Sequence, residues 1–302
     1  EEHERYYNGF SNAVLWPILH GLPDLVSYDR GAAQIYRAVN ERIAEGVRHL
    51  LAPTDLVWVH DYHLLPLPAI LRTRGVVAPI GFFLHVPFPR PDIFALAPEA
   101  RSLLRDLLAA DLIGFRTPAD ADNFAAAAQR FAGALRLSDG SLTHAGRRVR
   151  LGVFPVEIDP RGFAALSAAA ERPVEQLRRS LDGQRLVLGA DRLDPTKGLV
   201  QRLSGYRRVL ETRPEWRRGI TMLQIAAASR QDVASYRDLR AALERQAGAI
   251  NAEFGDPDWT PLRLVTRAVP RDAVAGYMRL ARVGLVTPLR DGMNLVAKEF
   301  VA

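Results

Sequence analysis

Short apolar runs alternate along this chain with longer amphipathic stretches, and this alternation restricts the possible folds more than any other feature of the sequence. Residues 56–59 are typical of a short buried strand, whereas residues 32–51 carry apolar side chains at the spacing of a helix. Strands that alternate with helices favour β-α-β units around a parallel sheet. The sequence therefore predicts an α/β fold.

The expected elements fall into two sets, and a chain of 302 residues is long enough to bury two cores. We expect two Rossmann-like parallel-sheet domains, residues 1–158 and 159–302, that face each other across a cleft, with ligands beyond the carboxyl ends of the strands. Strands are expected at residues 56–59, 80–84, 112–115, 185–189, 220–226, 262–265 and 283–287, with a hairpin within 137–149. Helices are expected at residues 32–51, 64–74, 100–108, 118–133, 173–181, 199–212, 233–251 and 271–280.

Composition argues against several classes of protein. The chain has no cysteine, which removes disulfides, thiolate nucleophiles and thiolate metal ligands. Its net charge of +6 is spread as arginine among acidic residues without a basic run, which argues against a nucleic-acid-binding surface. No apolar run approaches the roughly 20 residues that cross a bilayer, and the first residues lack the pattern of a secretory signal, so we expect a cytoplasmic protein.

The loop after the expected strand at 185–189 contains Lys197, one of two lysines in the chain. Arg192 and Lys197 lie on this loop, so both can converge on a diphosphate and offset the charge that develops on a leaving group, in place of a metal ion. The alternative is a surface turn whose charges pair with Asp191 and Asp194.

Residues 286–299 contain the other lysine and read as a strand that ends at Pro288 and a helix that begins near Asn294. The start of a helix directs free backbone N–H groups at whatever lies beyond the strand, and a diphosphate suits it. Asp291 is placed to hold sugar hydroxyls, and Glu299 to accept hydrogen bonds from a ribose diol. An ordinary strand-to-helix connection explains the same spacing about equally well.

Polar residues also follow two strands of the first set. Asp61 and His85 each come just after a strand, and the carboxyl ends of neighbouring parallel strands lie at the same edge of a sheet. We interpret Asp61 as a carboxylate that binds hydroxyls and His85 as a sugar contact, although a His after a strand is often only structural. His60 and His63 lack a further ligand at the usual spacing, so a zinc site is the weaker interpretation.

Two further segments carry weaker signals. Tyr7 and Trp16 lie among amides near a Gly, a composition suited to a sugar or a phosphate, although aromatic clusters usually form core. Arg230 follows the strand at 220–226 and reads as an ordinary helix start unless its guanidinium reaches an acceptor phosphate.

Taken together, five segments resemble the trehalose-6-phosphate synthases, retaining glycosyltransferases of family 20, in order and spacing across essentially the whole chain. The resemblance implies the GT-B fold and the transfer of glucose from UDP-glucose, or another nucleotide-linked glucose, to glucose 6-phosphate, which gives α,α-trehalose 6-phosphate. The segments are residues 7–12, 58–66, 81–89, 191–198 and 287–299.

The resemblance also implies a role for each candidate residue, with Asp61, His85, Arg192 and Lys197 as the catalytic set. On the donor side, the diphosphate ligands are Arg192 and Lys197, and the ribose ligand is Glu299. The transferred sugar contacts His85. Sugar and diphosphate are also held by Asp291 and by the backbone of Met293, Asn294 and Leu295. On the acceptor side, they are Tyr7, Trp16 and Arg230 for the phosphate and Asp61 for the ring. No metal and no cofactor are expected, since the nucleotide sugar is a substrate, and the departing phosphate oxygen takes the acceptor proton on the front face.

The chain departs from the family's pattern at two positions and at its ends. Pro195 stands where the family usually has Tyr and Glu157 where it usually has Gly, so the choice of donor or acceptor can differ. We interpret the chain as a fragment, because it lacks an initial Met and the family's N-terminal loop and stops inside an expected helix.

Three alternatives stay open. The first is a synthase of the same fold with another acceptor, such as a glucosylglycerol-phosphate synthase or a cyclitol-coupling pseudo-glycosyltransferase. The second is a non-catalytic regulatory subunit, which the presence of Arg192, Lys197, Asp291 and Glu299 disfavours, and the third is a nucleic-acid-binding protein. The donor base and the oligomeric state, including a homo-oligomer, are not determined by the sequence.

Overall fold

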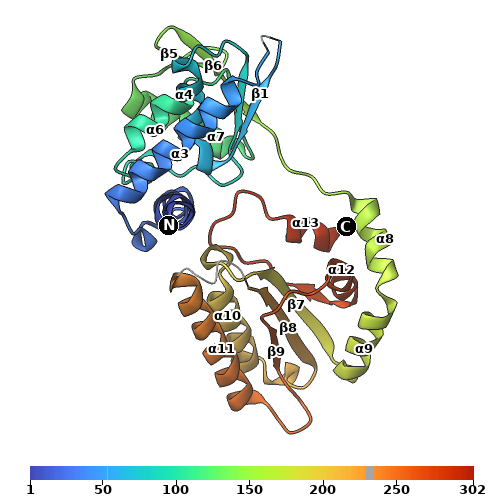
Figure 1. Ribbon diagram of the computed structural model, residues 1–302. Helices are drawn as coiled ribbons and strands as arrows, with labels where there is room; N and C mark the ends of the chain where they lie inside the picture. The colour runs from blue at the N-terminus through green and yellow to red at the C-terminus, as the bar shows by residue number, and fades with distance from the viewer. Residues whose placement is uncertain (53, 229–233) are drawn as a thin grey trace. The chain divides into compact units, whose positions relative to one another are not determined.

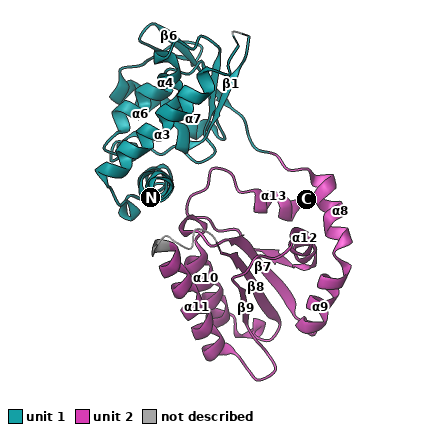
Figure 2. Ribbon diagram, viewed as in Figure 1, with its two compact units in different colours: residues 1–156 teal, residues 157–302 magenta. Residues whose placement is uncertain are grey.

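The computed structural model describes residues 1–52, 54–228 and 234–302. The chain divides into two compact units, residues 1–156 and 157–302 (Figure 2). Each unit is built on a sheet that contains parallel strands and is packed against helices (Figure 1). The α/β fold class predicted from the sequence is therefore confirmed.

Unit 1 contains a six-stranded sheet in the order β1-β2-β3-β6-β5-β4. The first four strands in this order are parallel, whereas β5 and β4 continue the sheet antiparallel, and β5 and β6 form the hairpin expected within residues 137–149. The strands are β1 (Val57–His60), β2 (Ile80–Phe83), β3 (Leu112–Phe115), β4 (Leu135–Arg136), β5 (Leu142–His144) and β6 (Arg147–Val153).

The helices of unit 1 enclose one continuous core with the sheet. They are α1 (Glu2–Glu4), η1 (Arg5–Leu15), α2 (Trp16–Leu19), η2 (Pro23–Leu25), α3 (Arg30–Arg48), η3 (Tyr62–Leu64), α4 (Leu67–Thr73), α5 (Pro91–Phe94), α6 (Ala100–Leu107), α7 (Pro118–Ala127) and η4 (Ala128–Ala132).

The first helical stretch, α1 to α2, was not predicted from the sequence. Its central part, η1, is a π-helix whose buried side chains Tyr6, Phe10 and Val14 recur every fourth residue. Gly9 lets this helix approach α3 closely, because a Cβ at Gly9 would lie 2.9 Å from the Cβ of Ala32. The apolar period was present, but amides and a Gly between the aromatic residues concealed it.

Unit 2 contains a four-stranded parallel sheet in the order β10-β7-β8-β9, with helices on both faces (Figure 1). Its strands are β7 (Arg185–Arg192), β8 (Ile220–Ala227), β9 (Leu262–Val265) and β10 (Val283–Gly284). Its helices are α8 (Pro160–Ala169), α9 (Glu171–Leu181), η5 (Pro195–Lys197), α10 (Leu199–Thr212), η6 (Pro214–Trp216), α11 (Ala234–Phe254), α12 (Arg271–Leu280) and α13 (Leu295–Val301).

Successive residues of β7 point to opposite faces of this sheet, as the pleat requires. Val187 packs into the core shared with α10 and α11, whereas Leu186 and Leu188 pack into the core shared with α8, α9 and α12. Both faces are therefore buried, which explains why the strands of unit 2 read as continuous apolar runs rather than as alternating ones.

The largest differences from the prediction in unit 2 concern α8 and β10. Helix α8 was not predicted, and β10 covers two residues rather than the expected 283–287. The chain beyond β10 still donates one backbone hydrogen bond, from Leu285 to Leu188, before Pro288 ends any further pairing.

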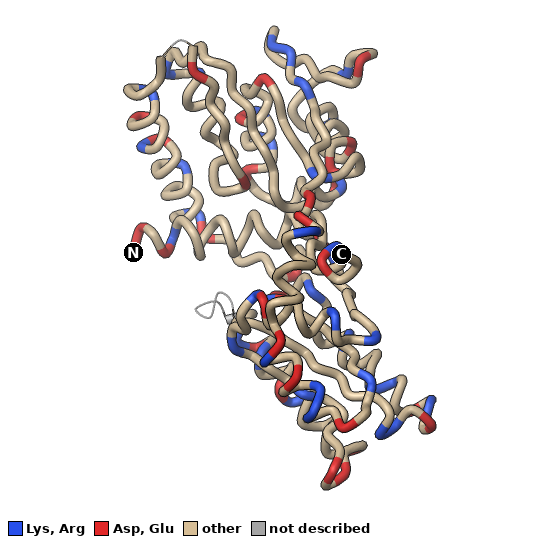
Figure 3. Tube along the Cα trace, turned by 90° about the vertical axis from the view of Figure 1, so that its right-hand side faces the viewer, with Lys and Arg blue, Asp and Glu red and all other residues tan. Residues whose placement is uncertain are grey.

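Charged residues of both signs are scattered along the traces of both units (Figure 3). Of the helices that the structure describes, none is long and apolar enough to cross a membrane.

Candidate active site

Two of the predicted site residues lie together at the carboxyl ends of β1 and β2. The parallel register pairs His60 with Phe83, so Asp61 and His85, which follow, reach the same edge of the sheet. The backbone N–H of His85 donates to Oδ1 of Asp61 at 3.2 Å, and Nε2 of His85 lies 2.8 Å from Nδ1 of His60. The sheet thus gathers an acid and two imidazoles at one edge.

Asp61 has a backbone conformation that is unusual for a residue with a side chain. Its φ of 71° and ψ of 169° lie in a region used almost solely by glycine, at a cost on the order of 1–3 kcal/mol. The backbone is held on both sides, because Asp61 donates to the carbonyl of Phe83 and accepts from the N–H of Leu64. Strain of this kind concentrates at functional sites, which supports a functional role for Asp61.

His85 is partly buried, and its surroundings favour the neutral imidazole. Burial lowers the pKa of His85 below the ordinary 6.5, and the nearby Arg116 and His60 lower it further, whereas Asp61 acts in the opposite direction. The ring of Phe83 meets the imidazole edge-on, with 4.8 Å between the ring centroids. A neutral imidazole carries one N–H donor and one acceptor nitrogen, which suits contact with a sugar hydroxyl.

Tyr7 and Trp16 lie in different environments. Tyr7, in η1, is 40% exposed, and its ring lies 5.3 Å from the ring of His63. Trp16, the first residue of α2, is buried and packs 4.3 Å from the ring of His20. In this conformation a ligand reaches Tyr7 more readily than Trp16.

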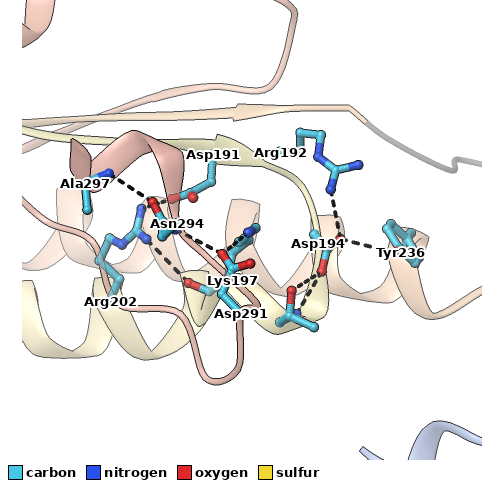
Figure 4. A network of polar contacts seen from close by, with 10 residues as sticks. Asp191, Arg192, Asp194, Lys197, Arg202, Tyr236, Asp291, Asn294 and Ala297 are labelled. Carbon is cyan, nitrogen blue, oxygen red and sulfur yellow. Dashed lines mark hydrogen bonds and ion pairs between the residues drawn. The ribbon is translucent and has the colours of Figure 1, made fainter. Parts of the chain in front are cut away.

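In unit 2, the loop after β7 and the loop before α13 are joined (Figure 4). Oδ1 of Asp194 accepts from the backbone N–H and the hydroxyl of Thr196, at 2.9 and 2.6 Å. The carbonyl of Thr196 in turn accepts from the N–H of Leu289 at 2.7 Å. Gly198 permits this approach, because its φ is +60° and a Cβ there would overlap the carbonyl oxygen of Thr287.

Three predicted donor-site residues meet where these two loops join (Figure 4). Nζ of Lys197 lies 2.5 Å from Oδ2 of Asp291, and the two side chains are only 15% and 19% exposed. Nδ2 of Asn294 donates to the same oxygen at 3.1 Å, while its Oδ1 accepts from the N–H of Ala297 and caps α13. We call Lys197, Asp291 and Asn294 the Lys197–Asp291 cluster.

Arg202 supports both loops, although the sequence analysis did not select it. Its guanidinium, on α10, is fully buried and pairs with Asp191 at 2.7 Å. It also donates to the hydroxyl of Thr287 at 3.0 Å and to the carbonyl of Lys197 at 3.4 Å. Burial raises the pKa of Asp191 although Arg202 opposes the shift, so the ion pair offsets only part of the desolvation.

The sequence did contain a signal for Arg202. The residue lies between Leu199 and Leu203 on the buried face of α10, where a charged side chain needs a partner. The alternative in which Arg192 and Lys197 pair with Asp191 and Asp194 holds only in part. Arg192 lies 3.9 Å from Asp194, but Lys197 pairs with Asp291 instead.

The remaining donor-side candidates lie outside the Lys197–Asp291 cluster. The side chain of Arg192 is 61% exposed at the end of β7. Glu299 pairs with Arg271 of α12 at 3.1 Å. Met293 accepts from Nζ of Lys298 at 3.1 Å, and Leu295 is the first residue of α13. In this structure Arg192 and Glu299 are therefore not part of the contact that joins Lys197 to Asp291.

The prediction for Arg230 and the weaker interpretation of a zinc site remain. Arg230 lies outside the described residues. Within residues 1–52, 54–228 and 234–302, no group of three or more His, Asp or Glu side chains is placed to hold a metal ion. His60, which the zinc interpretation paired with His63, contacts the ring of His85.

A hollow of about 950 Å³ in unit 2 lies among β7, α10, η6 and the chain after β10. Its wall is mainly apolar and includes Val187, Tyr206, Val209, Trp216 and Leu285. Lys197, Asp291 and Arg192 do not line it. The size of a cavity therefore does not identify the charged cluster in this unit.

Solved structures share this architecture. An α,α-trehalose-phosphate synthase (UDP-forming) from Burkholderia xenovorans in complex with glucose-6-phosphate is 41% identical, with a TM-score of 0.95 over 99% of this chain and 67% of its own. An E. coli structure bound with UDP-2-fluoro glucose is 42% identical, with a TM-score of 0.96 and the same coverage. The architecture is therefore the GT-B fold of the class of glycosyltransferases, as predicted.

The family is equally well defined. The family model of glycosyltransferase family 20 matches residues 1–302. The trehalose-6-phosphate synthase of Cronobacter sakazakii is 43% identical over 303 residues, which cover 100% of this chain and 64% of that relative. The chain belongs to glycosyltransferase family 20 and spans just under two thirds of the length of this curated relative.

Proposed function

We propose that the protein transfers glucose, with retention of configuration, from UDP-glucose or another nucleotide-linked glucose to glucose 6-phosphate, which yields α,α-trehalose 6-phosphate. The observation that carries the proposal is the Lys197–Asp291 cluster, a paired ammonium and carboxylate beside the carboxyl end of β7 in a chain that matches its family throughout. The bound molecules named for the B. xenovorans and E. coli relatives support both substrates.

On the donor side, unit 2 would bind the nucleotide sugar. Lys197 and Arg192 would hold the diphosphate, and their positive charges would stabilise the negative charge that develops as it departs. Asp291 and the backbone of Met293, Asn294 and Leu295 would hold glucose and diphosphate, and Glu299 the ribose. Two cations would thus do the work that a divalent metal does elsewhere, so we propose that the reaction needs no metal.

On the acceptor side, unit 1 would bind glucose 6-phosphate. Tyr7 and Trp16 would hold its phosphate and Asp61 its ring, and Arg230, which follows β8 in the sequence of unit 2, would add a contact to the phosphate. His85 would contact the transferred sugar. The fixed backbone of Asp61 supports this assignment, because its conformation is already held in place and loses little conformational entropy when the carboxylate binds a hydroxyl.

The chemistry requires one bond to form and one to break at the same carbon. The bond between C1 of glucose and the diphosphate oxygen breaks, and C1 forms a bond to the acceptor hydroxyl on the same face. The acceptor proton passes to the departing phosphate oxygen, so no side chain becomes a covalent nucleophile. Positioning and charge stabilisation then supply the rate.

The test is an assay of nucleotide release from UDP-, GDP- and ADP-glucose with glucose 6-phosphate, with the product identified by mass and NMR. It is run on this chain and, where the chain belongs to a longer polypeptide, on that polypeptide. Lys197→Ala is expected to lower the release rate by about 10²–10³-fold, the usual loss when one charge-stabilising donor is removed. Arg178→Ala, an exposed cation on α9, is the matched control and should leave the rate unchanged.

Formation of trehalose 6-phosphate would support both the reaction and the acceptor. Donor binding without turnover on glucose 6-phosphate would instead favour another acceptor on the same fold or a regulatory subunit. Equal rates for Lys197→Ala and Arg178→Ala would contradict the role of Lys197.

A further inference from the structure

A further polar residue, Arg116, stands at the edge of unit 1 where Asp61, His60 and His85 lie. Arg116 directly follows β3, the strand that pairs with β2, just as Asp61 follows β1. Nη2 of Arg116 lies 3.3 Å from Nδ1 of His85, and Nε2 of His85 lies 2.8 Å from Nδ1 of His60. Three successive strand ends therefore supply one row of side chains, Arg116, His85 and His60.

This row has one consistent arrangement of protons. A guanidinium has N–H donors and no acceptor, so Nδ1 of His85 must carry a lone pair toward Arg116. A neutral His85 then carries its proton on Nε2, which donates to Nδ1 of His60. His60 in turn carries its own proton on Nε2. Protonation of His85 at Nδ1 would break the bond to Arg116 and bring two donors together.

Arg116 has few other partners. Its Nε is buried without a hydrogen-bond acceptor, and no ion pair joins its guanidinium to a carboxylate of the described residues. The acceptor that the structure gives to this cation is Nδ1 of His85. A partly buried cation without a carboxylate is costly, so a role at the imidazole explains its presence better than a role in folding does.

We propose that Arg116 is a positioning residue, which fixes His85 as the neutral tautomer with its proton on Nε2, and that His60 holds this proton until a sugar hydroxyl replaces it. The role of His85 as a sugar contact rests on the function proposed above, whereas the tautomer itself does not.

The charged or ionisable groups that face His85 each raise or lower its pKa. Arg116 and His60 disfavour a second proton on the ring, Asp61 favours one, and the ring of Phe83 contributes no charge. Burial lowers the pKa of His85 most, Arg116 and His60 lower it further, and together these effects outweigh that of Asp61. The result is a ring that acts as a hydrogen-bond donor through Nε2 at neutral pH rather than as an acid.

The tautomer can be measured on this chain without any assay of glucosyl transfer. The chain has seven histidines, so ¹⁵N-histidine labelling gives a small set of two-dimensional NMR signals, and His60→Gln and His85→Gln assign the two of interest. In the native chain the His85 signal should show an unprotonated Nδ1 and a protonated Nε2, with a pKa below 6.5.

Three variants separate the hydrogen bond of Arg116 from its charge. Arg116→Leu should let both tautomers of His85 appear and should raise its pKa, whereas Arg116→Gln, which keeps an N–H donor without the charge, should keep the tautomer and raise the pKa less. Arg136→Leu, which removes an exposed cation of the same unit, is the matched control and should change neither. The unchanged signal of buried His20 verifies that each variant is folded.

A native His85 with its proton on Nδ1 would overturn the proposal, and so would an Arg116→Leu chain that keeps both the tautomer and the pKa of His85. Failure of the transfer assay with the tautomer intact would instead refute the proposed function and leave the role of Arg116 in place.

Discussion

The two candidate sites, one in each unit, are assembled in opposite ways. In unit 1, His60 and His85 stack beside a strained Asp61, and the guanidinium of Arg116 lies against the ring of His85. In unit 2, the partly buried ammonium of Lys197 pairs with a carboxylate, and a fully buried pair, Arg202 with Asp191, supports it. The comparison teaches that a fold can place polar groups either through backbone strain and ring packing or through buried ion pairs. Mutations in the two sites should therefore lower the unfolding free energy by different amounts.

The largest effect is expected from Arg202→Met. The variant leaves Asp191 without its partner in a buried site and removes the bonds to Thr287 and Lys197, so unit 2 should lose about 3–5 kcal/mol of unfolding free energy. Pulse proteolysis in urea, read by mass spectrometry, measures each unit separately. Arg208→Met, an exposed cation on the same helix, is the control. The double variant Arg202→Met with Asp191→Leu should recover part of the loss, and no recovery would show that the ion pair is not the cause.

The next effect concerns the contact between the two loops of unit 2. Gly198→Ala places a Cβ against the carbonyl of Thr287 at a φ of +60°, so it should cost unit 2 about 3 kcal/mol. It should also separate Lys197 from Asp291. Gly248→Ala, inside α11 with no atom within 4 Å of the new Cβ, should be neutral or stabilising. Equal stability of the two variants, measured by the same proteolysis, would mean that the loops move apart freely.

A smaller effect should reveal the strain in unit 1. Asp61→Gly removes the carboxylate and the strain together, whereas Asp61→Ala removes the carboxylate and keeps the Cβ in an unfavourable region. The Gly variant should therefore be more stable than the Ala variant by about 1 kcal/mol, after the greater flexibility of Gly in the unfolded chain is subtracted. Urea unfolding of unit 1 compares them directly. An Ala variant as stable as the Gly variant would place no strain at Asp61.

The smallest effect is a dependence on pH. The pKa of His85 is lower in the folded chain than the ordinary 6.5, so between these two values the unfolded chain binds more protons. Stability from this group is complete above about pH 6.5 and declines as the pH falls through the lowered pKa. Between about pH 7.5 and pH 5.5, the unfolding free energy of unit 1 should fall by up to roughly 1 kcal/mol more in the native chain than in His85→Gln. The difference is small because the pKa of a partly buried imidazole shifts only modestly. His144→Gln, on β5, is the control and should follow the native profile.

The course of the backbone was predictable because it depends on local apolar spacing. The strand β3 and the helix α10 were predicted with the bounds that the structure shows, since each buries a regular set of side chains. The π-helix η1 was not predicted, because its apolar residues recur at a period of four among amides. The positions of Asp61 and His85 at one edge followed from the parallel sheet.

The polar contacts were less predictable because they join residues distant in sequence. Lys197 and Asp291 are separated by 93 intervening residues, and nothing local to either identifies the other. Arg116 was overlooked although it follows the third strand as Asp61 follows the first. Reading the residue after every parallel strand, rather than only the conspicuous histidines, would have found it.

Because Lys197 pairs with Asp291, the carboxylate of Asp291 competes with any ligand anion for the ammonium of Lys197. A carboxylate tethered beside an ammonium acts at an effective concentration in the millimolar range or above, so any free anion must outcompete it before it reaches Lys197. A dilute simple anion cannot do so. The nucleoside diphosphate of the proposed donor would do so, because it would bring two charged groups together with a base and a sugar that bind elsewhere. The ion pair would then favour multivalent anions over simple ones at Lys197.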